Sequence, residues 1–177
     1  MAIKSSENQY GSRAVFFHWF TAILILSMIP LGIYMHELPA SDWKATLYKA
    51  HIVMGIVIFV TTILRIGWKL MDNKVTELKT TPRYQQIMAK ALHYIFYAMM
   101  LGAAGSGLGY IIFSGLGEQL FLADNVVWPN PRDFLPAEVH EMLTIPMIPL
   151  LALHILAALY HQFIVKDGIF RRIWFKA

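Results

Sequence analysis

The sequence predicts an all-α membrane protein, a four-transmembrane-helix bundle. Of its 177 residues 57% are hydrophobic, the mean hydropathy is +0.51 and only 15% are charged, a composition unusual for a soluble domain. The charged residues are clustered, and four long apolar runs separate the clusters. Each run can cross a hydrocarbon core of about 30 Å as a helix that rises roughly 1.5 Å per residue. The simplest organisation is a single membrane domain over residues 1–177.

The first helix is expected at about residues 14–36. Its apolar run, "AVFFHWFTAILILSMIPLGIYM", is too long for the core of a signal peptide and lacks a small-residue cleavage site. We therefore expect it to be retained as a spanning helix.

Three further helices are expected at about residues 45–70, 86–113 and 139–165. The last helix contains Pro146 and Pro149, which are expected to kink it. The long connection that precedes it, "GEQLFLADNVVWPNPRDFLPAEVH", holds three prolines and is expected to be irregular or partly interfacial.

The charges predict an orientation. Twelve basic and four acidic residues, a net charge of +8, lie in the N-terminus, the connection between the second and third helices, and the C-terminus. The other side carries three basic and seven acidic residues, a net charge of −4. The basic residues of the first side are Lys4, Arg13, Arg65, Lys69, Lys74, Lys79, Arg83, Lys90, Lys166, Arg171, Arg172 and Lys176, and those of the second are Lys44, Lys49 and Arg132. The positive-inside rule places both termini in the cytoplasm, so the pI of about 9.3 reflects topology and does not indicate nucleic-acid binding.

Four histidines lie at two matched depths of the predicted bundle. His51 and His140 begin their helices on the outer side, and His18 and His154 lie toward the inner side. Fourteen residues separate His140 from His154, which is about 21 Å of helix and close to a whole number of turns, so both share one face. Two opposed imidazoles can ligate the iron of one porphyrin, and this pattern predicts two bis-histidine sites stacked across the bilayer.

Two other interpretations of the histidines were considered. A single intramembrane histidine often serves only helix packing, which remains open for each one alone, but ionisable residues at two matched depths are usually functional. A zinc ion needs its ligands close together and does not suit histidines separated by about 21 Å. The chain has no cysteine, which excludes thiolate metal sites and covalent C-x-x-C-H haem attachment.

Several other residues are candidates for the cofactor sites. Arg65 shares a face with His51 at the inner depth, where it would suit a haem propionate or simply snorkel to the interface. Gly55, one turn after His51, would admit a porphyrin or serve close packing. His93 and His161, near the inner surface, are candidates to hydrogen-bond a quinone and relay its proton, or to pack between helices.

Two histidines leave further alternatives. His161 lies on nearly the same face as His154 and is an alternative inner ligand. His36 falls at the outer end of the first helix, where we expect it in the interface.

The chain resembles the bacterial cytochrome b561 family of small four-helix dihaem proteins. The resemblance rests on "FFHWFTA", "YKAHIVMGIVIFVTTILRIGWKL" and "VHEMLTIPMIPLLALHILAALYHQFIVKDGIFRRI". It implies two haem b groups per chain, held by His18 with His154 and by His51 with His140. It also implies a multi-pass protein of the bacterial inner membrane, surrounded by lipid, that exchanges electrons with ubiquinone. One family member resembles a superoxide oxidase, so the outer donor would be superoxide or a redox protein, and the activity that of a superoxide:ubiquinone oxidoreductase.

Two rival functions remain open at this stage. Cytochrome subunits of nickel–iron hydrogenases and formate dehydrogenases are more distant relatives, so the chain would alternatively be a cytochrome b anchor that passes electrons from a partner dehydrogenase or hydrogenase to quinone. The other rival is a haem-free four-helix transporter or scaffold.

Overall fold

The computed structural model describes residues 2–78, 81–123 and 125–175, and it confirms the predicted fold class. Four helices are long and apolar enough to cross a membrane, and the described residues contain no strand. They are α1 (Ser12–Glu37), α2 (Asp42–Met71), α3 (Arg83–Phe113) and α5 (Leu135–Tyr160), which continues as the π-helix η2 (His161–Val165). Lys79, Asp124 and Lys176, which entered the charge count above, lie outside the described residues.

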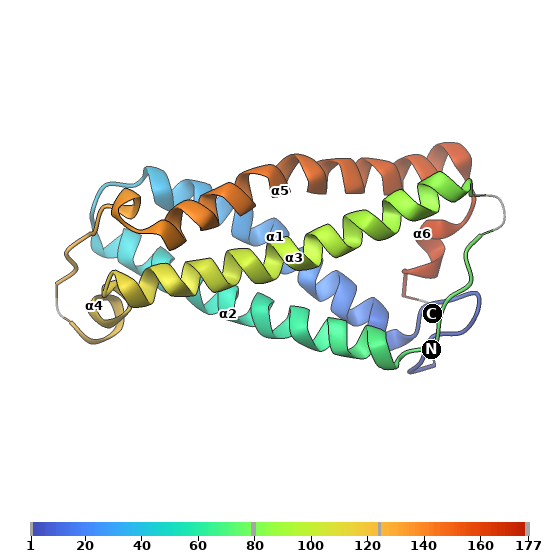
Figure 1. The fold of residues 1–177 in the computed structure, drawn as a ribbon, viewed down its shortest axis with the longest axis horizontal. Helices are drawn as coiled ribbons and strands as arrows, with labels where there is room; N and C mark the ends of the chain where they lie inside the picture. The colour runs from blue at the N-terminus through green and yellow to red at the C-terminus, as the bar shows by residue number, and fades with distance from the viewer. Residues whose placement is uncertain (1, 79–80, 124, 176–177) are drawn as a thin grey trace.

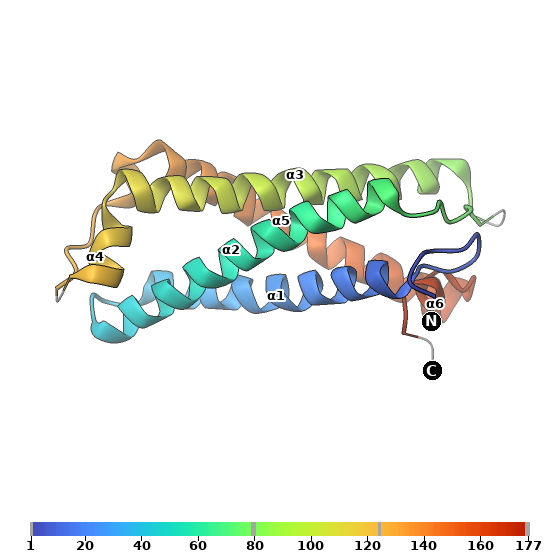
Figure 2. The same ribbon diagram turned by 90° about the horizontal axis from the view of Figure 1, so that it is seen from below.

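The bundle is elongated and its two ends differ (Figures 1 and 2). Both chain termini and the short helix α6 (Ile169–Arg172) lie at one end, here called the termini end. The other end carries helix α4 (Leu116–Leu122) and is called the α4 end. Helix α1 packs along α2, α2 along α3, and α3 along α5, whereas α5 has no comparably extensive backbone contact with α1 or α2. Side chains therefore span the distance from α5 to α1 and α2.

All four long helices begin two to four residues earlier than the apolar runs predict. The first turns of α1, α2 and α3 begin with polar or charged residues, which hydropathy does not detect. In α2 the side chain of Ser41 accepts a hydrogen bond from the backbone of Lys44 at 3.2 Å and caps the helix. In α5 a proline occupies the first turn. Backbone N–H groups there have no acceptor within the helix, so the lack of an N–H on proline costs no hydrogen bond.

The connection between α3 and α5 is more regular than predicted. It contains α4 and a short 3₁₀ turn, Pro131–Asp133. Gly115 adopts a left-handed conformation (φ 69°) that turns the chain sharply out of α3. Leu116 is 0% and Leu120 2% exposed, so α4 covers its end of the bundle with apolar side chains.

The middle of the bundle holds a small core. Tyr97, Met99 and Met100 of α3 pack with Met147 of α5. Many large apolar side chains remain on the outer surface, as expected for helices that face lipid. The core lies on α3 between the levels of the two histidine pairs described below.

The termini end is closed by polar contacts instead. The N-terminal segment folds back, so that the backbone N–H of Ser5 donates to Asp72 Oδ1 at 2.8 Å and Gln9 Nε2 donates to the carbonyl of Arg172 at 2.9 Å. Partial burial raises the pKa of Asp72, but hydrogen bonds from Ser5 and Asn73 outweigh it and hold this pKa below its usual value. We call residues 2–11 the N-terminal clasp.

Candidate haem-binding sites

At the α4 end, His51 of α2 faces His140 of α5. Their ring centroids lie 6.1 Å apart. Nδ1 of His140 lies 2.8 Å from the backbone carbonyl of Ala103 and therefore donates to it, which leaves Nε2 free of hydrogen and available as a ligand. Nδ1 of His51 is buried without a hydrogen-bond partner among the described residues, which costs about 1–3 kcal/mol if the ring serves packing alone.

Two glycines make room for this pair. A Cβ on Gly107 of α3 would lie 3.1 Å from Nδ1 of His140, and a Cβ on Gly32 of α1 would lie 3.3 Å from Cε1 of His51. Both distances are shorter than ordinary van der Waals contact, so any side chain at these positions would press on an imidazole. Each histidine of the α4-end pair therefore rests against the backbone of a neighbouring helix.

At the termini end, His18 of α1 faces His154 of α5, with ring centroids 6.4 Å apart. A third imidazole, that of His93 on α3, lies 5.3 Å from His154, and Phe96 packs against the same ring at 5.6 Å. Nδ1 of His93 lies 2.6 Å from the carbonyl of Ala89 in the preceding turn, which fixes the orientation of its ring. This end thus holds three imidazoles where the α4 end holds two.

Both facing pairs have the size that two axial ligands of one iron require. A metal–imidazole bond is about 2 Å long and the ring centroid lies about 1 Å beyond the nitrogen, so two axial imidazoles place their centroids roughly 6 Å apart. The separations of 6.1 and 6.4 Å meet this requirement at two levels of the bundle. The chemistry also fits, because neutral imidazole is a ligand of haem iron and the backbone of α5 makes no extensive contact with that of α1 or α2.

Arg65 belongs to the termini-end site, at the depth that the sequence predicts. Its Nη2 lies 2.9 Å from Nδ1 of His18, and its guanidinium lies 5.4 Å from the ring centroid of Tyr97. Arginine has only donors, whereas a histidine that ligates through Nε2 carries its hydrogen on Nδ1. Ligation by His18 therefore requires Arg65 to release this contact, and its charge is then available to an anionic group such as a propionate.

The structure also places two nearby residues. His161 has its ring turned to Asp167, with Nδ1 2.6 Å from Oδ2, whereas it is the ring of His154 that faces His18, at 6.4 Å. The nearest atom to a Cβ on Gly55 would be Cε of Met28 at 3.7 Å, an ordinary contact that agrees with the packing alternative. His36 lies in the last turn of α1 and is exposed, as expected for the interface.

Four contacts of the sites were not predicted from the sequence. They are the approach of Gly32 to His51, the approach of Gly107 to His140, the contact of the Ala103 carbonyl with His140, and that of Asp167 with His161. The spacing of the glycines within their own helices carries no information about which neighbouring side chain they meet. A signal for Asp167 was present, because it stands six residues after His161 in a polar stretch that ends the last helix.

A membrane bundle with two facing imidazole pairs, one toward each end, is the architecture of a transmembrane b-type cytochrome. Residues 9–176 match the family described as prokaryotic cytochrome b561, and the chain belongs to this family. It is 25% identical to cytochrome b561 homolog 2 of Escherichia coli (strain K12), over 98% of this chain and 95% of the relative. It is 24% identical to cytochrome b561 homolog 1 of the same organism, over 94% and 97%.

Family membership establishes the general activity. The protein is a membrane cytochrome that binds haem b and takes part in electron transport.

Proposed function

We propose that the chain carries electrons across the bacterial inner membrane through two bis-histidine b haems, with both termini in the cytoplasm. One haem would be held by His51 and His140 and the other by His18 and His154. The observation that carries this proposal is the pair of centroid separations, 6.1 and 6.4 Å, at the two levels of the bundle. Held by these histidines, each haem would supply one-electron iron chemistry.

The protein's own residues hold and shield these ligands. The carbonyl of Ala103 fixes the ring of His140 in the tautomer that presents Nε2. Leu116 and Leu120 of α4 cover the adjacent end of the bundle and keep water from it. At the other level, Phe96 packs against His154 and limits the rotation of its ring.

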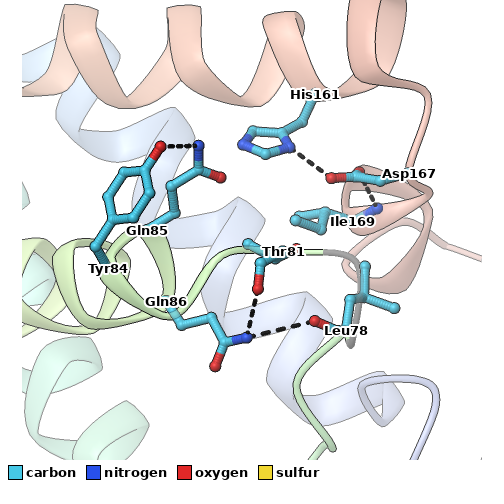
Figure 3. A network of polar contacts seen from close by, with 8 residues as sticks. All are labelled: Leu78, Thr81, Tyr84, Gln85, Gln86, His161, Asp167 and Ile169. Atoms are coloured by element: carbon cyan, nitrogen blue, oxygen red, sulfur yellow. Dashed lines mark hydrogen bonds and ion pairs between the residues drawn. The ribbon is translucent and has the colours of Figure 1, made fainter.

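The proposed electron acceptor is ubiquinone, bound near the termini end. His161 is the residue that we assign to a quinone carbonyl, because one ring nitrogen is held by Asp167 and the other is turned away from it (Figure 3). His93 is less suited to this role, since its Nδ1 is engaged with Ala89 and its ring lies against His154. We assign His93 to the packing of the termini-end pair.

The proposed donor is a small one-electron reductant at the α4 end, superoxide in particular. This side has a net charge of −4, but two of its three cations, Lys44 and Lys49, lie on the first turns of α2, the helix that carries His51. Nζ of Lys44 donates to the carbonyl of Leu38 at 2.6 Å and lies 5.2 Å from the ring centroid of Trp128, and Nζ of Lys49 lies 5.9 Å from that of Phe121. In this proposal the held ammonium groups, and not the net charge of the side, attract the anion. Superoxide decay measured by stopped flow with ubiquinone present should exceed spontaneous dismutation, and equality would exclude this donor.

Haem quantitation on the purified protein tests the central proposal. Two b haems per chain are expected, and His51→Ala and His154→Ala should each remove a different one, seen as the loss of different spectral components. His36→Ala is the matched control, because His36 is an exposed α1 histidine outside both pairs and its removal should leave two haems. Two normal haems in both ligand variants would refute the pairing, and a colourless protein would favour the haem-free alternative. Stable co-purification of an Fe–S partner would favour the anchor subunit.

A further inference from the structure

The last turn of the α5 segment changes its hydrogen-bond pattern. From His161 to Val165 the helix is a π-helix, and the N–H of Lys166 donates to the carbonyl of His161 at 2.8 Å. Lys166 (φ 57°) and Gly168 (φ 81°) then adopt left-handed conformations on either side of Asp167. Single π-helical turns are uncommon and occur frequently at functional sites, and a non-glycine residue in the left-handed region adds local strain. The backbone is therefore shaped at this point to return Asp167 toward His161.

The carboxylate of Asp167 is held on both oxygens. Oδ2 lies 2.6 Å from Nδ1 of His161, and Oδ1 accepts the backbone N–H of Ile169 at 3.0 Å. The side chain of Asp167 is only 6% exposed and that of His161 19%. Figure 3 shows the second ring nitrogen of His161 turned away from Asp167, toward the α3 side chains Tyr84 and Gln85. The imidazole is thus fixed with one nitrogen bound and the other presented.

Asp167 also borders an open pocket at the termini end. The pocket has a volume of about 440 Å³. Its lining residues are mostly polar or charged: Gln162, Lys166, Asp167, Gly168 and Arg171. The open pocket gives the aqueous phase a route to Asp167, the partner of His161.

We propose that Asp167 is a positioning residue for proton delivery by His161 during ubiquinone reduction, an inference that rests on the proposed function. Ubiquinone takes up two electrons, delivered one at a time by the cytochrome, and two protons, and both carbonyls become hydroxyls. In one of these steps the bond between Nε2 of protonated His161 and its hydrogen breaks as the new O–H bond of the quinol forms. Throughout, the carboxylate of Asp167 accepts a hydrogen bond from the Nδ1–H group of His161. It thereby balances the charge of the protonated ring and holds Nε2 toward the quinone. The ring then regains its proton from the aqueous phase, which also supplies the second proton.

The test compares an acceptor that takes protons with one that does not. Purified protein is reduced, and reoxidation of its haems is followed by stopped flow with ubiquinone or with ferricyanide. Asp167→Asn should slow reoxidation by ubiquinone at least about tenfold, as the loss of an orienting carboxylate does elsewhere. Reoxidation by ferricyanide, haem content and the affinity for oxidised ubiquinone should stay within about twofold, and Asp167→Glu should recover part of the ubiquinone rate.

Glu77→Gln is the matched control, because Glu77 is an exposed carboxylate at the same end, paired with Lys90 at 2.7 Å. It should react with both acceptors as the wild type does. An Asp167→Asn protein that reacts with ubiquinone at the wild-type rate would overturn the inference alone, and so would one slowed equally with both acceptors, which indicates a merely structural role. A wild-type protein whose reduced haems ubiquinone does not reoxidise would overturn the proposed acceptor and this inference with it.

Discussion

The two ends of the bundle carry the same kind of imidazole pair in different surroundings. At the α4 end the pair contacts uncharged groups: the rings rest on Gly32 and Gly107, and His140 is held by a backbone carbonyl. At the termini end Arg65 contacts His18, and His93 adds a third imidazole. The cover differs as well, apolar in α4 and polar in the N-terminal clasp.

This difference predicts different redox properties for the two sites. A fixed positive charge disfavours the oxidised haem, which carries one more positive charge than the reduced form. Arg65 should therefore raise the potential of the termini-end haem relative to the haem at the α4 end. Electrons would then move favourably from a donor at the α4 end toward the termini end, where His161 and Asp167 can serve a proton-coupled acceptor.

The α4-end pair should be the more sensitive to backbone crowding. Gly107→Ala places a methyl group 3.1 Å from Nδ1 of His140 and pushes the ring from the Ala103 carbonyl. We expect haem affinity at the α4 end to fall by about tenfold. Loss of a hydrogen-bond partner that orients a metal ligand typically lowers affinity by about 10- to 100-fold, and this change is expected at the lower limit. Haem titration of the apoprotein, followed by its absorption spectrum, measures this, and the termini-end haem should bind normally.

Gly105→Ala is the matched control, because a Cβ at Gly105 meets no atom within 4 Å. Replacing glycine by alanine in a helix interior is otherwise stabilising by roughly 1 kcal/mol, so this variant should bind both haems and unfold at an equal or higher temperature. Equal haem binding by the two alanine variants would show that Gly107 serves helix packing and not the ligand.

The termini-end pair should be the more sensitive to charge. Arg65→Gln removes the cation beside His18, and the potential of that haem should fall by on the order of 50 mV, close to a tenfold change for one electron. Redox titration in the His51→Ala background isolates the termini-end haem, and the His154→Ala background isolates the other. Arg65→Lys keeps the charge and should change the potential little. A shift of equal size in both backgrounds would contradict the assignment of Arg65 to one end.

The sequence predicted those features that are determined within a single helix, such as depth, shared face and span. The fourteen-residue spacing of His140 and His154 determines both a depth difference and a shared face, because the rise and twist of a helix are fixed. The four spans follow from hydropathy alone. The pairing of the histidines stays a prediction, although the ring separations fit it.

Features that depend on the register between helices were not predictable. Gly107 meets His140 only because α3 and α5 pack at one particular offset, which no single helix determines. Helix α4 lies in a connection that the sequence predicts to be irregular or partly interfacial, because seven residues give too short a pattern, although Leu116 and Leu120 are four residues apart on its buried face. In the π-helix at His161 the backbone N–H donates to the carbonyl five residues earlier instead of four. Residue preferences do not predict this change of hydrogen-bond pattern.

The smallest expected effect concerns the cover of the termini end. Asp72→Asn should loosen the N-terminal clasp by about 1–2 kcal/mol at neutral pH, because the charged carboxylate accepts hydrogen bonds from Ser5 and Asn73. The hydrogen bonds lower the pKa of Asp72 in the folded protein, despite partial burial that raises it. Its contribution to stability is therefore present above the unfolded pKa of about 3.9 and is lost as the pH falls through the lower folded value.

Amide hydrogen exchange of the clasp measures this contribution, and α4 serves as an internal reference. Wild type and Asp72→Asn should differ in the protection of residues 2–11 at pH 7 and converge at the lowest accessible pH, while protection of α4 should be the same in both. Ser6→Ala, which removes only an exposed hydroxyl 3.4 Å from the carbonyl of Gln9, should resemble the wild type at every pH. A pH-independent difference would show that the side-chain shape of Asp72, and not its charge, holds the clasp. A loss of protection in α4 would show that the two ends unfold together. The difference between the polar clasp and the apolar α4 cover would then have no consequence for local stability.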